Sequence, residues 1–341
     1  MSDHPLCLPS ASGPWCPKNY GGKYKGTVNL RQALAWSLNS ISVQLLTEHD
    51  PPEGEVRGVF KLIDLFNRIS IDTTHVEPVN PAAVGAYSIA PYDQVVGYAT
   101  IGSLGKQLPK QIGASRGGVI IRKVLDRHGN SLDVVDAPNM FVMRPEIVYE
   151  LLYLMLGSVE LDGGTGRRMQ KLGRPIAAKT GTSNNANDLW FTAISPQLAV
   201  GTWVGHAISP MPVAIPPCVT CGLKSGTGGE IALPFVYAFM DDVMTGMPVL
   251  DFPVPSQIRQ VLIGKELVPF APGKMPAALQ SPVAENITAT SAPIQKTVVK
   301  KKVTPKKKVV SKKKAVAKKK VITKKPPVKA PVKKKTVPKK K

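Results

Sequence analysis

The chain has 341 residues and a formal net charge of +22, and this excess charge lies in its last part. From Lys296 to Lys341 there are 22 lysines and no acidic residue, so the remaining residues hold 45 − 22 = 23 basic against 23 acidic side chains. No apolar run approaches the roughly 20 residues needed to span a bilayer, and the N-terminus lacks the basic-then-apolar pattern of an export signal. We therefore expect a nearly neutral globular body, no membrane-spanning helix and a strongly basic tail.

The first 26 residues are rich in Pro, Gly and Ser, and we expect 1–26 to be an irregular lead-in. Apolar residues then recur at helical spacing, and the polar residues 37–40 interrupt them with types that prefer caps and turns. This pattern predicts a helix, a polar turn and a second helix. The predicted helical ranges of the chain are 30–36, 41–46, 59–69, 92–101, 146–155 and 235–244, with Pro91 and Pro145 in first turns.

Other segments are predicted to be non-helical. Residues 119–125 and 132–135 alternate apolar and polar types around Arg127–Asn130, which is typical of a hairpin. The glycine-rich residues 163–166 are expected to be a flexible link. Prolines among Ala, Ser and Thr mark 266–295 as a disordered linker, and the lysine repeats over 296–341 cannot fold alone. The domain expected to fold thus covers 27–265.

The stretch from Ala177 to Thr182 is followed by two apolar runs, 189–194 and 198–204, which are separated by Ser195-Pro196-Gln197. These runs are rich in aromatic and β-branched residues, which favour strands. The sequence therefore predicts three antiparallel strands, with the first at the edge of the sheet.

The edge strand carries Lys179-Thr180-Gly181-Thr182, which suits a peptide that ends in a carboxylate. Lys179 offers a positive charge with three donors, and Thr180 and Thr182 offer hydroxyl groups beside it. Gly181 has no Cβ to obstruct a peptide that lies along the strand and exchanges main-chain hydrogen bonds with it. The alternative for this short motif is a solvated lysine beside a turn.

The four cysteines lie in two pairs, Cys7 with Cys16 and Cys218 with Cys221. Two local disulfides are possible. A zinc site with four cysteine ligands is the more specific alternative to disulfides, but only the second pair has the spacing of a zinc knuckle. No βαβ pattern surrounds that pair, so a redox motif is not favoured either. We expect neither a metal nor a cofactor.

Ser37-Leu38-Asn39 followed much later by Lys179-Thr180-Gly181 resembles the second and third of three motifs in serine enzymes that act on D-alanyl peptides and β-lactams. The surrounding residues narrow the resemblance to the transpeptidase domain of class A penicillin-binding proteins of the 1A type, over residues 17 to about 255. The supporting segments are 19–23, 30–34, 164–166, 172–175, 188–191 and 201–205.

This resemblance implies an α+β, penicillin-recognising fold, with an antiparallel sheet flanked by helices, and an enzyme that crosslinks peptidoglycan stem peptides and is trapped by β-lactams. If the roles of the family's motif residues apply to the matching positions, Ser37 relays a proton and Asn39 holds the substrate amide. Lys179, Thr180 and Thr182 bind the terminal carboxylate. Without the resemblance, Ser37 and Asn39 read as a turn that caps its neighbour. The family implies a place in the cell envelope, on the periplasmic side of the inner membrane.

The chain departs from the family at the nucleophile, which belongs to a Ser-x-x-Lys motif well before Ser37. The matches present, Ser103–Lys106 and Ser311–Lys314, do not occupy that position and are taken as coincidental. We therefore expect an N-terminally truncated domain without its glycosyltransferase domain, inactive alone, that pairs with the missing N-terminal half. An apolar trough would stay open without the helix that bears the nucleophile.

Two other classes of function remain open. The chain could be a non-catalytic envelope module, or a nucleic-acid-associated protein that acts through residues 296–341. The tail has no aromatic residue and no arginine, which argues against base stacking and base readout. Charge alone predicts that it binds anionic polymers.

Overall fold

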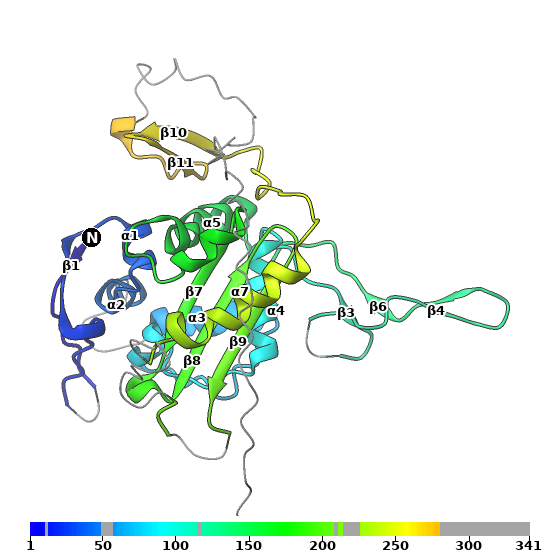
Figure 1. Ribbon diagram of the computed structural model, residues 1–341, viewed down its shortest axis with the longest axis horizontal. Helices are drawn as coiled ribbons and strands as arrows, with labels where there is room; N and C mark the ends of the chain where they lie inside the picture. The colour runs from blue at the N-terminus through cyan, green and yellow to red at the C-terminus, as the bar shows by residue number, and fades with distance from the viewer. Residues whose placement is uncertain (11–12, 49–56, 115–116, 208–210, 214–225, 280–341) are drawn as a thin grey trace, which may run out of the picture. The chain divides into compact units, whose positions relative to one another are not determined.

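The computed structural model describes residues 1–279 except 11–12, 49–56, 115–116, 208–210 and 214–225 (Figure 1). The chain divides into two units, Met1–Ile294 and Gln295–Lys341. The second unit, with the lysine-rich tail, lies outside the described residues, so its expected disorder stays a prediction.

A three-stranded antiparallel sheet carries the motif strand at one edge. Its strands are β7 (Ala177–Thr182), β8 (Asp188–Ile194) and β9 (Ala199–Gly205), in that order. Lys179 pairs with Thr192 across β8. The predicted three antiparallel strands are therefore confirmed, with the lysine motif on the edge strand.

Helices cover both faces of this sheet. Opposite residues in antiparallel strands share a face, and Ala178, Phe191 and Ala193 pack on one face against α7 (Leu233–Val243). Ala177 and Ile194 pack on the other face with α4 (Pro91–Gly102) and α5 (Pro145–Glu160). Figure 1 shows α7 and α4 on opposite sides of the strands. This is the predicted sheet flanked by helices.

Two short helices bring the serine motif to the sheet. These are α1 (Leu30–Ala35) and α2 (Asn39–Thr47), and α1 lies against α5. At the start of α1, the Asn29 side chain accepts from the backbone of Gln32 and the Gln32 side chain accepts in return, which completes a capping box. The predicted helix, turn, helix is confirmed. The turn is shorter than expected, because Asn39 and Ser40 already belong to α2.

The other predicted helices are present. They are α3 (Arg57–Arg68), α4, α5 and α7, and α5 extends to Glu160 instead of ending at Met155. Among the described residues, no helix is long and apolar enough to cross a membrane. The remaining helical turns are η1 (Tyr20–Gly22), η2 (Asn80–Val84), η3 (Arg167–Leu172), η4 (Asn184–Ala186), α6 (Gly228–Ile231) and η5 (Ala277–Leu279).

The N-terminal segment is more ordered than an irregular lead-in. Strand β1 (Ser2–Asp3) pairs with β2 (Gly26–Thr27), and a disulfide joins Cys7 to Cys16. Asp3 is 2% exposed, and its carboxylate accepts hydrogen bonds from Asn19 Nδ2, the Lys25 amide and Ser40 Oγ. This buried cluster of polar groups fixes the segment to α2, which composition alone does not indicate.

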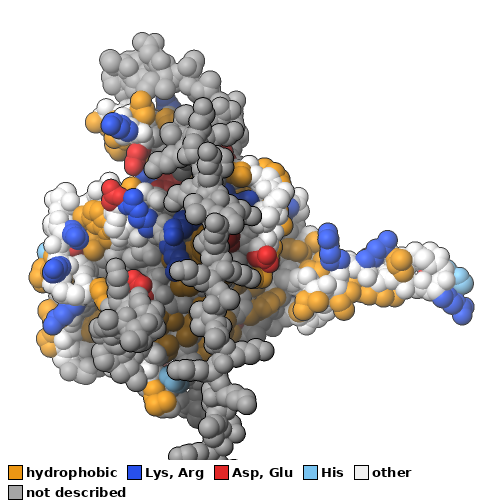
Figure 2. Space-filling view, in the orientation of Figure 1, with side chains coloured by type: hydrophobic (Ala, Val, Ile, Leu, Met, Phe, Trp, Pro, Cys, Tyr) orange, Lys and Arg blue, Asp and Glu red, His pale blue; other side chains and the backbone are white. Residues whose placement is uncertain are grey.

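Residues 106–141 form an arm that begins and ends at a β-bridge between Lys106 and Phe141. The predicted hairpin is present but short: β4 (Val124–Leu125) pairs with β5 (Ser131–Leu132), while β6 (Val135–Asp136) pairs with β3 (Lys110–Gln111). Figure 1 shows the arm extending away from the sheet, and Figure 2 shows apolar side chains along it. Each of its strands has two residues, and apolar side chains beside them stay exposed; Ile120, for example, is 93% exposed.

A last hairpin spans residue 265, where the globular body was expected to end. Strand β10 (Arg259–Ile263) pairs with β11 (Glu266–Phe270), so residue 265 lies in the turn between two paired strands. Arg31 of α1 donates to both Glu160 and Glu266, and the Ala271 amide donates to Glu150. The boundary at 265 was therefore placed too early, because Pro269 and its neighbours read as a linker although they continue a β-strand.

Candidate active site

Ser37 and Lys179 meet although they are 142 residues apart in the chain. Lys179 Nζ donates to Ser37 Oγ over 2.6 Å and to the carbonyl of Thr180 over 2.9 Å. Strand β7 supplies the lysine, and the turn between α1 and α2 supplies the serine. The structure thus brings the two predicted motifs together at the edge of the sheet.

The backbone of Ser37 adopts a left-handed conformation, with φ of 55°. This costs a residue other than glycine about 1 kcal/mol or more. Two main-chain hydrogen bonds hold the turn, Ser37 N to Leu34 O and Leu38 N to Ala33 O, and Leu38 is buried beside it. The surrounding packing therefore maintains the strained turn that directs the Ser37 hydroxyl toward Lys179.

Burial lowers the pKa of Lys179 to about 8. Its side chain is half-buried, and none of the ion pairs between described residues includes it. An incoming anion would therefore find a cation without a carboxylate partner in this part of the chain. At neutral pH the lysine is mainly charged, and it can exchange a proton with the hydroxyl it contacts.

Asn39 is the first residue of α2, but its side chain hydrogen-bonds to neither Ser37 nor Lys179. Its Nδ2 donates to the backbone carbonyl of Lys18 over 2.8 Å. The N-terminal segment thereby holds the Asn39 side chain in one orientation, with Oδ1 as its remaining acceptor.

The two threonines of the motif each contact a residue that the sequence analysis did not name as a site residue, although Thr165 lies in the segment 164–166 that supported the family resemblance. Thr180 Oγ1 donates to Thr165 Oγ1 over 3.1 Å, and Thr182 Oγ1 accepts a hydrogen bond from the Gly228 amide over 3.1 Å. Thr165 belongs to the segment expected to be a flexible link. A hydroxyl residue among three glycines was the available signal for Thr165. Nothing in the sequence alone indicates Gly228.

Gly181 lies opposite Trp190 in the neighbouring strand. A Cβ at Gly181 would approach Trp190 Cβ to 2.9 Å, so a larger residue would disturb the pairing of the strands. Within the described residues β7 pairs with β8 alone, which leaves its other edge available to an extended chain.

The profile of the penicillin binding protein transpeptidase domain matches residues 9–214. The chain belongs to this family. Penicillin-binding protein 1A of Rickettsia conorii is 28% identical over 290 residues, which cover 80% of this chain and 34% of that protein. Penicillin-binding protein 1A of Aquifex aeolicus is 30% identical over 268 residues, which cover 78% of this chain and 33% of that protein. The class A, 1A-type resemblance is confirmed.

A solved structure supports the fold of this transpeptidase domain. The crystal structure of penicillin-binding protein 1A from Haemophilus influenzae matches with a TM-score of 0.66 and 19% identity, over 81% of this chain and 45% of that one. The penicillin-recognising fold is therefore confirmed. The chain spans about a third of the length of the curated relatives it matches.

The Ser-x-x-Lys match within the described residues, Ser103–Lys106, does not join the site of the transpeptidase domain. Ser103 lies at the end of α4, with its Oγ 3.0 Å from the carbonyls of both Thr100 and Lys106. The adjacent Gly102 packs near Ile194, at the far end of β8 from Trp190. Ser311–Lys314 falls outside the described residues. The interpretation of Ser103–Lys106 as coincidental agrees with this geometry.

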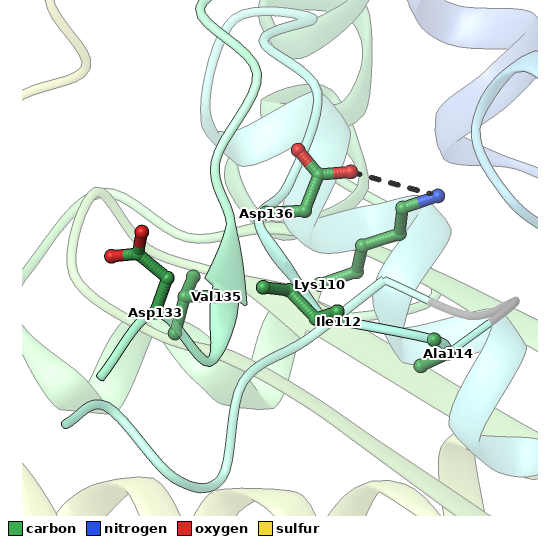
Figure 3. A pocket seen from close by; sticks show the side chains of 7 residues that line it. Lys110, Ile112, Ala114, Asp133, Val135 and Asp136 are labelled. Carbon is green, nitrogen blue, oxygen red and sulfur yellow. Dashed lines mark ion pairs between the residues drawn. The ribbon is translucent and has the colours of Figure 1, made fainter. Parts of the chain in front are cut away.

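Metal-binding residues, the cysteines and a hollow on the arm are the other candidate features. The described residues hold no group of three or more His, Cys, Asp or Glu that could bind a metal ion. Cys7 and Cys16 form one of the two possible disulfides, while Cys218 and Cys221 lie outside the described part. The open hollow in Figure 3 lies on the arm and includes the Lys110–Asp136 ion pair of 3.8 Å, but no predicted site residue.

Proposed function

We propose that this chain supplies the substrate-orienting part of a D,D-transpeptidase site that acts on peptidoglycan stem peptides. The contact between Lys179 and Ser37 beside the open edge of β7 carries this proposal. It combines a cation, a hydroxyl and a strand edge in one place, which is what a peptide with a C-terminal carboxylate requires. Stem peptides and β-lactams are the ligands this family implies, and the cell envelope is the corresponding location.

Lys179 acts as the counter-charge of the terminal carboxylate, and Thr180 and Thr182 donate hydrogen bonds to it. The bound peptide runs along β7 and exchanges main-chain hydrogen bonds with that strand. Gly181 keeps this part of the strand free of a side chain. A carboxylate near Nζ favours the charged lysine, so binding raises the pKa of Lys179 from its value of about 8 in the free chain.

Ser37 and Asn39 serve the reacting part of the peptide. The short contact between Ser37 Oγ and Lys179 Nζ provides a path for a proton toward the leaving nitrogen. The hydrogen bond from Asn39 Nδ2 to Lys18 leaves Oδ1 as the acceptor for a substrate amide N–H.

Acyl transfer also needs an activated nucleophile. The described residues bring no Ser-x-x-Lys pair to Ser37 and Lys179, because Ser103 is engaged at the end of α4. We therefore propose that the chain does not acylate by itself. A segment that supplies Ser-x-x-Lys completes the site, fills the apolar trough that we expect in its absence and is the partner this chain requires.

Labelling with a fluorescent penicillin tests this proposal. The chain alone is expected to give no covalent band on a denaturing gel, and co-expression with a preceding segment of a class A protein that contains Ser-x-x-Lys is expected to restore the band. In the complemented protein, Lys179→Ala is expected to weaken labelling. A band from the chain alone that disappears in Ser103→Ala would contradict the proposal.

The lysine tail suggests a second activity, carried by its 22 lysines without an acidic residue. We propose that residues 296–341 bind anionic polymers by charge alone, with nucleic-acid association as the alternative to an envelope polymer. Affinity is expected to fall steeply with salt, and DNA, teichoic acid and lipopolysaccharide are expected to compete. Competition at two salt concentrations tests this, with a chain that lacks 296–341 as the control; preference for one DNA sequence would contradict it.

A further inference from the structure

Both threonine hydroxyls of the motif strand are held by residues from distant segments. The Gly228 amide donates to Thr182 Oγ1 over 3.1 Å, and Thr165 Oγ1 accepts from Thr180 Oγ1 over 3.1 Å. An amide N–H can only donate, so it occupies a lone pair of Thr182 and leaves the proton of that hydroxyl for another acceptor.

The turn that carries Gly228 is fixed tightly against the sheet. Thr227 Oγ1 accepts from the Glu230 amide over 3.3 Å, which closes the turn. A Cβ at Gly228 would lie 2.2 Å from Trp190 O and 2.4 Å from Gly181 O. Such close approach of two backbones requires glycine and places its N–H at the end of the motif strand.

Thr165 is fixed just as firmly, although glycines surround it. Its amide donates to the carbonyl of Ala35, two residues before Ser37, and a Cβ at Gly164 would come within 2.3 Å of Ser158 O. A Cβ at Gly229 would lie 3.0 Å from Thr165 O, so the two supporting segments also touch. Thr165 therefore links the turn of Ser37 with the hydroxyl of Thr180.

We propose that Gly228 and Thr165 are positioning residues that direct the hydroxyl protons of Thr182 and Thr180 toward a bound carboxylate. In the free chain Thr180 donates to Thr165; when the carboxylate arrives this hydrogen bond reverses, so that Thr165 donates to Thr180 and the Thr180 proton turns to the ligand. An ionised carboxylate only accepts hydrogen bonds, whereas a carboxamide also presents donors, so this arrangement favours ligands with a free C-terminus. The inference rests on the proposed function, because it concerns the same carboxylate position.

Titration of the ¹⁵N-labelled full chain with acetyl-D-alanyl-D-alanine, and with its C-terminal amide, tests the inference by NMR. The Gly228 amide signal is expected to shift with the carboxylate form. Thr165→Val removes a hydroxyl at nearly constant volume and is expected to weaken binding of the carboxylate form about threefold to tenfold, the range for one hydrogen bond, with little effect on the amide form. Thr165→Ser keeps the hydroxyl and is the matched control.

The outcomes separate the inference from the function on which it rests. If Thr165→Val weakens binding of the carboxylate and the amide form equally, Thr165 has a merely structural role and the inference is overturned. Unchanged affinity for both forms in Thr165→Val would also overturn it. If Lys179→Ala abolishes binding of the carboxylate form while Thr165→Val does not change it, the proposed function stands and the positioning role fails. If Lys179→Ala leaves the preference for the carboxylate intact, Lys179 is not its counter-charge.

Discussion

The motif strand β7 and the arm of residues 106–141 are both antiparallel, yet they are supported very differently. β7 pairs with β8 along its whole length, is covered by α5 and α6, and receives contacts at Lys179 and Thr182 from distant segments. The arm consists of two-residue pairings, and its apolar Ile120 is almost fully exposed. The site residues thus belong to the part of the molecule that the core holds in place.

This difference shows where side-chain positions are determined. A hydroxyl or an ammonium group is useful for recognition only if its direction is fixed, and burial of the neighbouring residues fixes it. On β7, the fully buried Ala177 and Ala178 precede the half-exposed Lys179. The described strands of the arm contain no fully buried residue, so the arm is expected to contribute little to the stability of the fold.

Removing the largest side chain of the sheet core is expected to have the greatest effect. Phe191 is 0% exposed and pairs with Thr180. Phe191→Ala is expected to lower the free energy of unfolding by about 3–5 kcal/mol, because it leaves a cavity beside β7. Urea unfolding measures this, and Phe191→Leu, which keeps most of the volume, is the control. A loss below about 1 kcal/mol would show that the core does not support the strand as described.

The buried Asp3 is expected to have the next largest effect, because it anchors the segment that holds Asn39. Burial raises the pKa of Asp3, but hydrogen bonds from Ser40, Asn19 and Lys25 outweigh it and hold the pKa below 3.8. Asp3→Asn would bring an NH₂ group against these donors and is expected to cost about 1–3 kcal/mol at pH 7.

The pH dependence of this loss has a definite sign. A depressed folded-state pKa contributes stability that is present above the unfolded-state pKa and is lost as pH falls through the folded-state value. Thermal unfolding of the parent and Asp3→Asn is therefore expected to differ at pH 7 and to converge below about pH 4. A difference that does not change with pH would show that the Asp3 charge is not the cause.

The smallest effect is expected on the arm. Ile120 is 93% exposed, and Ile120→Ala is expected to change the free energy of unfolding by no more than about 0.5 kcal/mol. The same urea experiment compares it directly with Phe191→Ala. A loss of more than about 2 kcal/mol would mean that the arm is buried in solution and that the contrast with β7 does not hold.

The sequence predicted the sheet and the helices because both follow from local periodicity. Strand β7 and its hairpin were evident from the aromatic and β-branched residues around Trp190, and α4 and α5 from their first-turn prolines. The motifs that meet at Lys179 came from the family resemblance. Their contact could not be derived locally, because it depends on how α1 packs on α5.

The features that the sequence did not predict depend on contacts between distant segments. Pro269 suggested a linker, but β11 is held by Glu266 and by the pairing with β10. The N-terminal segment looked irregular because the donors of Asp3 come from three places in the chain. Gly228 carries no chemical signal at all, since its role lies in a backbone N–H whose position only the fold determines.

The affinity of the chain for acetyl-D-alanyl-D-alanine between pH 6 and pH 10 tests the role of Lys179 most directly. The peptide carboxylate is ionised throughout this range, so a change in affinity reports on the protein. Because carboxylate binding requires the charged lysine, the affinity is expected to be full below the free-state pKa of about 8 and to fall as pH rises through it. Lys179→Arg, charged throughout, is expected to bind without this pH dependence, and Lys179→Met to bind weakly at every pH. Calorimetric titrations that give the same affinity at every pH, and in Lys179→Met, would contradict the assignment of Lys179 as the carboxylate's counter-charge.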